Sequence, residues 1–189
     1  MEKLRLGLAM CGSFCTFSRV LEVFRGLTEK YDVIPIMSEN VAHTDTRFGK
    51  AEHFREVLEE YSGRDIIDTI TAAEPIGPKK LLDALVIAPC TGNTLAKLAA
   101  GIADTSVTLA AKAHLRNSRP LIIAVSTNDG LGANARNIGQ LMARQNVYFV
   151  PFGQDDAFGK PDSLVAHFER IDDTLQCAMK GEQIQPLLT

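Results

Sequence analysis

The sequence predicts an α/β fold: a single-domain Rossmann-like (flavodoxin-like) protein over residues 1–189, in which a mainly parallel sheet lies between two layers of helices. Short apolar segments alternate along the chain with segments whose apolar residues recur at helical spacing. The apolar segments are continuously hydrophobic, which is typical of strands buried on both faces of a parallel sheet. A length of 189 residues with 46% hydrophobic content suffices for one core.

The predicted elements follow one another in alternation. Strands are predicted at Leu4–Met10, Val33–Met37, Ala84–Ala88, Leu121–Val125 and Val147–Val150. Helices are predicted at Thr16–Lys30, Lys50–Tyr61, Thr105–Arg116, Ala133–Gln145 and, at the C-terminus, about 164–180. The stripe that indicates the C-terminal helix consists of Leu164, Phe168, Ile171 and Leu175. Residues 64–80 contain two prolines and a glycine and predict an irregular connector.

The segment from Leu85 to Ala113 carries the strongest indication of a ligand site. An apolar strand reaches Pro89 and is followed by the small polar loop 90–94, after which an Ala/Leu-rich helical pattern begins. A strand, a polar turn and a helix in this order direct backbone N–H groups at a ligand beside the helix N-terminus. Asn93 or Thr94 is expected to cap this helix through its side-chain oxygen.

Three further polar loops are expected at the same edge of the sheet, namely 11–13, 38–40 and 126–130. Each loop alone reads most simply as an ordinary turn. In a doubly wound sheet, however, ligands bind where the loops after the strands converge, so four such loops predict a binding site. The first turn has one glycine where a dinucleotide fingerprint needs three, and no GK[ST] triplet occurs. A single phosphate on Gly12 and Ser13, as in FMN, fits better than NAD or ATP.

Composition excludes several other classes of function. A formal charge of −3 without a basic block disfavours nucleic acid and anionic membranes as partners. No apolar run approaches the roughly 18 residues of a membrane span, and a cytoplasmic location is expected. The four cysteines have neither metal-ligand nor disulfide spacing, so no metal is predicted. Cys11 and Cys177 are interpreted as packing residues, whereas Cys15 and Cys90 lie beside predicted ligand loops.

The motif PCTGNTLAKLAAGIAD, residues 89–104, resembles the PASANT-type motif of the flavin-containing cysteine decarboxylases and flavin prenyltransferases. Gly12-Ser13 matches the first phosphate turn of this flavoprotein family, and Ser126-Thr127-Asn128 resembles the segment after its fourth strand. The resemblance implies a homo-oligomer with active sites at subunit contacts. It also implies an FMN site made by Gly12, Ser13, Phe14, Ser38, Thr91, Gly92, Asn93, Thr94 and Ser126.

Two departures from the family pattern argue against cysteine decarboxylation. Pro75 stands where the frame leading to Pro89 places the histidine of the decarboxylases, and a proline cannot transfer a proton. The Pro-Met-Asn signature after the fourth strand keeps only Asn128. None of the four histidines, which are His43, His53, His114 and His167, lies at a matching loop position.

Over nearly its whole length the chain resembles one branch of the family, which occurs in endospore-forming bacteria. Segments that carry this likeness are MCGSFCTFSRV, IMSENVAHTDTRFG and STNDGLGANARNI. The branch acts with a dehydrogenase-like subunit to make pyridine-2,6-dicarboxylate from a dihydro or hydroxytetrahydro precursor. The resemblance therefore implies FMN here, NAD(P) supplied through the partner subunit, a small dicarboxylate substrate, and the cytoplasm of the mother cell.

The residues leave the chemistry open between three hypotheses. An FMN-dependent oxidoreductase subunit leads, with Cys90, Asn93, Asn128 and Arg136 as substrate candidates and no catalytic residue assigned. A decarboxylase or prenyltransferase of the same family is the second hypothesis, and a non-catalytic flavin-binding scaffold is the third. Lys79 and Lys80 are further sources of positive charge for the substrate, although lysines are more often solvated surface residues. Residues 154–161 are read as a surface loop or, alternatively, a flap over the site.

Overall fold

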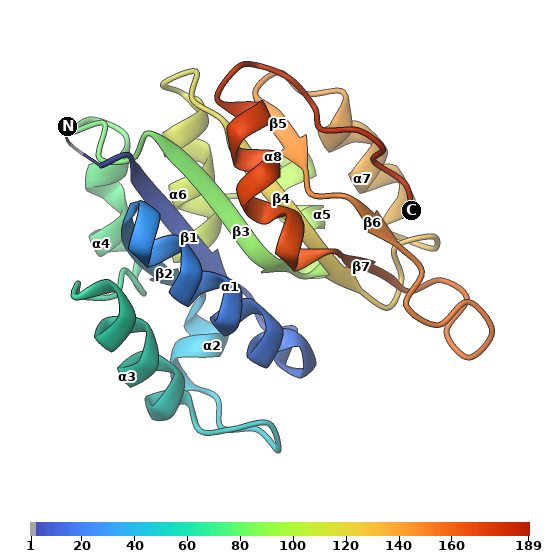
Figure 1. The fold of residues 1–189 in the computed structure, drawn as a ribbon, viewed down its shortest axis with the longest axis horizontal. Helices are drawn as coiled ribbons and strands as arrows, with labels where there is room; N and C mark the ends of the chain where they lie inside the picture. Colours follow the sequence, from blue (N-terminus) through green and yellow to red (C-terminus); the bar gives the residue numbers. More distant parts are fainter. Residues whose placement is uncertain (1–2) are drawn as a thin grey trace.

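The computed structural model describes residues 3–189 and contains one seven-stranded sheet with helices on both faces (Figure 1). The strands are β1 (Arg5–Met10), β2 (Asp32–Met37), β3 (Ala84–Cys90), β4 (Leu121–Thr127), β5 (Val147–Phe149), β6 (Phe152–Gly153) and β7 (Leu164–Ala166). The α-helices are α1 (Phe17–Lys30), α2 (Glu39–His43), α3 (Ala51–Ser62), α4 (Ile70–Ala73), α5 (Gly92–Ala100), α6 (Ser106–Leu115), α7 (Ala135–Met142) and α8 (Ile171–Ala178). Short 3-10 helices are η1 (Phe14–Thr16), η2 (Glu74–Ile76) and η3 (Phe168–Arg170).

The pairing of the strands confirms the predicted fold class. Strands β2, β1, β3, β4 and β5 are parallel and pair in that order, which is the flavodoxin-like arrangement. Helices α1 and α8 cover one face, and α5, α6 and α7 lie on the other (Figure 1). The carboxyl ends of β1, β2 and β3 consequently meet at one edge, as the polar loops predicted.

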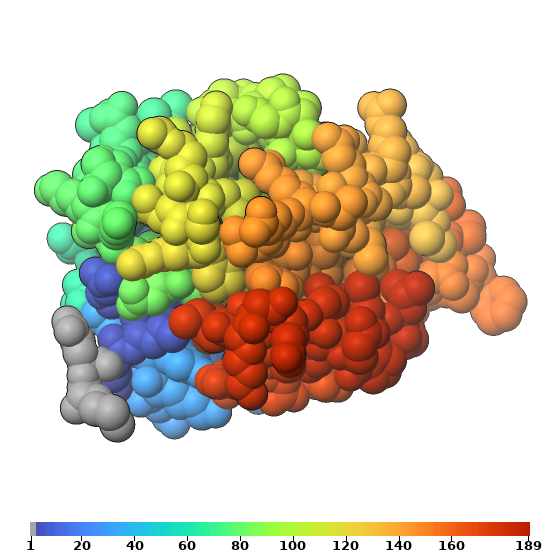
Figure 2. Space-filling model, turned by 90° about the horizontal axis from the view of Figure 1, so that it is seen from above, coloured from blue at the N-terminus to red at the C-terminus, as the bar shows by residue number. Residues whose placement is uncertain are grey.

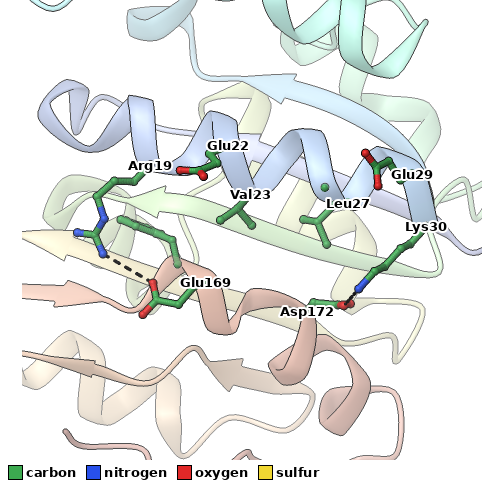
Figure 3. Close-up of a pocket in the computed structure, with 10 residues that line it drawn as sticks. Arg19, Glu22, Val23, Leu27, Glu29, Lys30, Glu169 and Asp172 are labelled. Carbon is green, nitrogen blue, oxygen red and sulfur yellow. Dashed lines mark hydrogen bonds and ion pairs between the residues drawn. The ribbon is translucent and has the colours of Figure 1, made fainter.

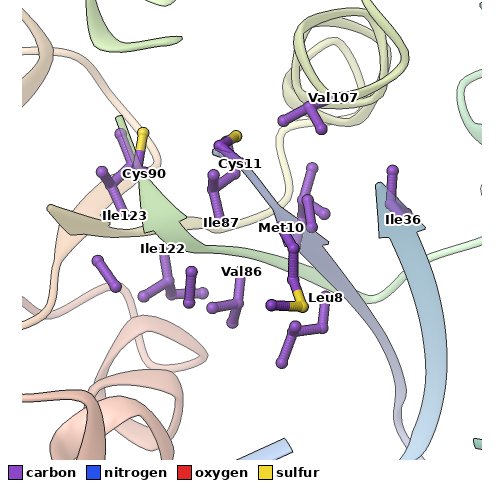
Figure 4. Packing of buried hydrophobic residues seen from close by; sticks show 14 of the residues in the cluster. Leu8, Met10, Cys11, Ile36, Val86, Ile87, Cys90, Val107, Ile122 and Ile123 are labelled. Atoms are coloured by element: carbon purple, nitrogen blue, oxygen red, sulfur yellow. The ribbon is translucent and has the colours of Figure 1, made fainter. Parts of the chain in front are cut away.

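The core explains why the strands are continuously apolar. All seven residues of β3 are buried. Figure 4 shows Leu8, Val86 and Ile122 on one side of the sheet, while Ile87 lies on the other side with Val107 of α6. Because both faces are covered, nearly every position along β1, β3 and β4 is removed from water, apart from Arg5 and Thr127 at strand ends.

The C-terminal helix begins later than the sequence predicts. Leu164–Ala166 form β7, which pairs antiparallel with the end of β4 and with β6, and α8 starts only at Ile171. Leu164 and Ala166 are buried while Val165 is half-buried, so these three residues alternate as a strand does. The prediction of a helix over 164–180 is therefore wrong in its first turns. The apolar spacing of four residues from Leu164 to Phe168 misled it, because this spacing fits a strand as well as a helix.

The connector 64–80 also contains more regular structure than predicted. The Thr69 side chain accepts the Ala72 N–H and caps α4, and η2 follows directly. Pro75 stands in the first turn of η2, where its missing N–H has no intrahelical partner to lose. In the described part of the chain, no helix combines the length and apolar character needed to cross a bilayer.

Residues 154–163 form a loop that projects from the body beside β6 and β7 (Figures 1 and 2). Its own hydrogen bonds hold it, since Gly159 N–H donates to Asp156 and the Gln154 side chain donates to the Pro161 carbonyl. Phe158 in this loop is fully exposed. The alternative that residues 154–161 act as a flap over the site stays a prediction.

Candidate functional site

A cavity of about 660 Å³ lies at the carboxyl ends of β1, β2 and β3. It is lined by Cys11 and Gly12 after β1, by Ser38, Glu39 and Asn40 after β2, by Thr91, Asn93, Thr94 and Lys97 around the start of α5, and by Ile70, Asp104 and Thr105. Three of the four polar loops that the sequence places at one edge therefore share one hollow. Its size is in the range of small-molecule and cofactor sites.

Helix caps place the polar side chains around this cavity. Ser38 caps α2 by accepting the Val41 N–H, and Thr91 caps α5 by accepting the Thr94 N–H at 3.3 Å. Thr105 caps α6 in a reciprocal capping box with Thr108. The prediction that Asn93 or Thr94 caps the helix after β3 is wrong: the cap is Thr91, so Asn93 and Thr94 lie in the first turn of α5.

Two buried thiols at the carboxyl ends of β1 and β3 are held neutral, and one of them, Cys11, lines the cavity. Thr94 donates its hydroxyl to Cys11 Sγ at 3.3 Å, and burial raises the pKa of the Cys11 thiol to about 11. Cys90, which belongs to the end of β3, is fully buried, and burial raises the pKa of its thiol well above the ordinary value. Figure 4 shows both cysteines among apolar side chains. Cys90 does not line the cavity, and its position fits a packing role.

Glu39 ties two of the loops together. Its Oε1 accepts the Ser106 N–H at the start of α6 at 2.9 Å, while the Ser106 hydroxyl donates to the Met37 carbonyl at 2.6 Å. Its Oε2 is buried and has no partner among the described protein groups. A carboxylate therefore stands in the cavity wall, and the part of a ligand beside it must be neutral or a hydrogen-bond donor.

Of the nine residues expected to hold FMN, five line the cavity: Gly12, Ser38, Thr91, Asn93 and Thr94. Ser13 adjoins it, and its hydroxyl is hydrogen-bonded to that of Ser126 at 2.7 Å. Phe14 packs its ring against Phe17 with 5.0 Å between the centroids. Their cofactor roles remain predictions.

Gly92 faces away from the cavity, toward the loop after β4. A Cβ at Gly92 would lie 2.5 Å from Asn134 Nδ2, 2.6 Å from Thr127 Oγ1 and 2.8 Å from Asp129 Oδ1. Asp129 accepts hydrogen bonds from the Thr127 and Asn134 side chains, and Asn137 donates to Asn134 at 2.8 Å. The Thr127 hydroxyl, followed by the Asn134 amide, holds the pKa of Asp129 below its usual value. This Asp129 network closes the far side of the α5 N-terminus.

The remaining candidates lie outside the cavity. Asn128 and Arg136 are exposed and do not line it, so their contact with substrate stays a prediction. His114 is buried in α6 and hydrogen-bonds to the Pro120 carbonyl at 3.0 Å. Sequence reasoning missed Lys97, which lies four residues after Asn93 in α5, a spacing that places both on one face of the helix.

A second hollow of about 460 Å³ lies between α1 and the start of α8 (Figure 3). Ion pairs of Arg19 with Glu169 and of Lys30 with Asp172 span it, with Val23 and Leu27 between them. None of the polar loops at the carboxyl edge contributes to it. Among the described residues, no group of three or more His, Cys, Asp or Glu side chains is arranged to hold a metal ion.

Comparison with known proteins gives consistent results. A family model described as Flavoprotein matches residues 1–181. The B subunit of dipicolinate synthase from Bacillus subtilis (strain 168) is 44% identical over 185 residues, which cover 97% of this chain and 92% of that protein. The crystal structure of the B subunit of dipicolinate synthase from Bacillus halodurans C has a TM-score of 0.91 and 42% identity, and covers 100% of this chain and 98% of that chain.

A more distant structure shares the fold. The FMN binding protein AtHal3 has a TM-score of 0.64 at 21% identity, with 93% of this chain and 96% of that chain covered. The family model and the two dipicolinate synthase relatives span nearly the whole chain. The chain therefore belongs to the flavoprotein family and is a homologue of the dipicolinate synthase B subunit.

Proposed function

We propose that this chain is the FMN-binding subunit of a dipicolinate synthase, an oxidoreductase that aromatises a dihydro or hydroxytetrahydro precursor to pyridine-2,6-dicarboxylate. It would act with the dehydrogenase-like A subunit, through which NAD(P) is supplied. The similarity to the B subunit over 97% of the chain carries the proposal, since it includes every loop of the cavity. A homo-oligomer in the cytoplasm of a sporulating mother cell is part of the same proposal.

The residues present fit one FMN. Gly12 offers a backbone N–H at the end of β1, and the hydroxyls of Ser38, Thr91 and Thr105 surround the cavity. The unpartnered Oε2 of Glu39 suits a hydroxyl or ring N–H donor and opposes a phosphate. Gly12 and Ser13 would hold the phosphate, and the hydroxyls of Ser38, Thr91 and Thr105 would meet uncharged parts of the cofactor.

When bound, the flavin supplies a hydride acceptor, and the protein supplies position and electrostatics. The Cys11 thiol, which lines the cavity, and the Cys90 thiol, which is buried at the end of β3, stay protonated at neutral pH and so transfer no proton. Thr91 and Thr94 orient the first turn of α5 through their mutual hydrogen bond of 3.2 Å. The aromatised ring carries two carboxylates, and the amide of Asn93 is a donor in reach of the cavity.

The cofactor part is tested by titrating the purified protein with FMN and following the visible spectrum and flavin fluorescence. We expect saturable binding that Ser13→Glu weakens at least tenfold, because a carboxylate would stand beside the phosphate. Ser18→Glu, at an exposed position of α1, is the matched control and should bind like the wild type. Absence of FMN binding by the wild type would exclude this part of the proposal.

A non-catalytic flavin-binding scaffold is the second candidate, and one observation favours it. No histidine is among the described residues that line the cavity, and the thiol of Cys11, which does line it, is neutral. Turnover by the dehydrogenase-like partner, measured with the wild type and with Ser13→Glu, separates the two functions. Turnover that depends on bound FMN supports the oxidoreductase function, whereas equal activation by both proteins supports the scaffold.

A further inference from the structure

The face of α5 that lines the cavity carries two donors four residues apart. Asn93 and Lys97 both line the cavity, and side chains at i and i+4 of a helix are neighbours with Cβ atoms about 6 Å apart. We propose that Asn93 and Lys97 together bind the two carboxylates of a cyclic dicarboxylate, the amide contacting one and the ammonium the other. This inference rests on the proposed function, from which it takes the class of substrate.

The charges around the cavity single out Lys97. It is the one cation among the described residues lining the cavity, whereas Glu39 and Asp104 contribute carboxylates. A dianion entering this hollow is repelled by both, and the Lys97 ammonium is the charge that offsets them. The start of α5, beside Asn93, adds the positive end of the helix dipole. The other cations considered from the sequence do not line the cavity: Lys79, Lys80 and Arg136.

Asp104 holds the ammonium in place before the substrate binds. Lys97 Nζ donates to both carboxylate oxygens of Asp104, at 2.9 and 3.1 Å. The Asp104 side chain is 57% exposed and the Lys97 side chain 23%, so the carboxylate is the partner nearer to solvent. An ammonium group has three donors, and here two point at a single carboxylate. The third donor remains for a substrate carboxylate, whose negative charge then competes with that of Asp104 for the Lys97 ammonium.

This competition gives two variants with effects of opposite sign. Lys97→Met removes the ammonium and keeps the length of the side chain, whereas Asp104→Asn removes the competing charge and keeps its shape. Binding of pyridine-2,6-dicarboxylate is measured by calorimetry, with FMN present, on each variant and on the wild type. We expect Lys97→Met to weaken binding about tenfold or more, as for loss of a charged hydrogen bond. Asp104→Asn should strengthen binding several-fold.

Controls separate recognition from stability. Lys112→Met changes an exposed lysine of α6 outside the cavity and should bind like the wild type. Pyridine-2-carboxylate, which has one carboxylate, serves as a comparison ligand. The wild type should bind pyridine-2,6-dicarboxylate more tightly than this ligand, and the preference should disappear in Lys97→Met. The thermal midpoint and FMN affinity of each variant are measured in parallel, and both should stay close to those of the wild type.

Three results would overturn the assignment. Equal dicarboxylate binding by the wild type and Lys97→Met shows that Lys97 does not contact the ligand. Weaker binding by both Lys97→Met and Asp104→Asn shows a structural ion pair, and a loss confined to FMN affinity assigns Lys97 to the cofactor. If the wild type binds FMN but no dicarboxylate, the substrate class named in the proposed function is wrong as well. If the wild type and Lys97→Met bind the dicarboxylate equally, only the assignment of Lys97 is wrong.

Discussion

The two sides of the α5 N-terminus differ although they belong to the same helical turn. On the side of Gly92, the Asp129 network packs against the backbone and its polar groups are partnered. On the side of Asn93 and Thr94, the same turn opens into the cavity. The glycine of the motif therefore serves close packing, and the polar side chains next to it are available to a ligand. Substitutions on the closed side should change stability, whereas those on the open side should change binding.

Gly92→Ala should have the largest effect on stability. Its Cβ would meet three side chains at 2.5 to 2.8 Å, and all three belong to one hydrogen-bonded network that cannot move without losing bonds. Overpacking together with broken polar contacts should lower the free energy of unfolding by about 4 kcal/mol. Chemical denaturation measures this change.

Gly139→Ala is the matched control for this substitution. Gly139 lies within α7, and nothing stands within 4 Å of a Cβ built there. Alanine in an unobstructed helix should raise the free energy of unfolding by roughly 0.5–1 kcal/mol. Equal effects of the two substitutions would contradict the close approach at Gly92.

Acid should destabilise the protein through His114, which is buried in α6. Burial lowers the pKa of this ring from 6.5 to about 4, and its Nδ1 has no partner among the described protein groups. The unfolded chain takes up the proton at the ordinary value, so the contribution is complete above pH 6.5 and is lost as pH falls toward 4. The loss should approach roughly 3 kcal/mol.

Urea unfolding of the wild type and of His114→Gln between about pH 7 and 4.5 measures this contribution. The glutamine amide can still donate to the Pro120 carbonyl but does not titrate, so the variant should show a flatter dependence on pH. His53→Gln, at an exposed position of α3, should keep the wild-type slope. A steep slope that persists in His114→Gln would assign the acid sensitivity to carboxylates instead.

The sequence predicts the open side better than the closed side, for a physical reason. Continuous apolar strands and polar loop residues are local signals, and parallel topology brings their ends together whatever the detailed contacts are. The contact of Gly92 with Asn134 joins residues far apart in the chain and leaves no local pattern. Lys97 was missed because the side of α5 that faces the cavity depends on where the helix begins. The residue that caps α5 and sets this start is Thr91.

The short strand β7, which lies between β4 and β6, was missed for a different reason. Three residues are too few for an alternating pattern to outweigh the helical spacing from Leu164 to Leu175. What selects the strand is the free edge at Ser126 and Thr127 of β4, where β7 completes the ladder. A partner strand that lies so much earlier in the chain is not visible in a local window.

Thr91→Ala tests the boundary between the two sides, because Thr91 is both the cap of α5 and a residue of the cavity. Loss of the side-chain acceptor for the Thr94 N–H should cost about 1 kcal/mol of stability. Thr91→Ser keeps the acceptor and should recover most of it. If both variants lose the same stability, the methyl group rather than the cap is responsible.

Asn93→Ala should have the smallest effect on stability and a clear effect on binding. The side chain is exposed in the first turn of α5, where alanine is a good helix former, so the free energy of unfolding should change by less than about 0.5 kcal/mol. Affinity for pyridine-2,6-dicarboxylate should nevertheless fall, because a donor facing the cavity is lost. The two measurements on one variant separate the open side from the closed side, since Gly92→Ala, one residue earlier, should show the reverse order of effects. A loss of stability in Asn93→Ala comparable to that in Gly92→Ala would mean that this turn is packed on both sides.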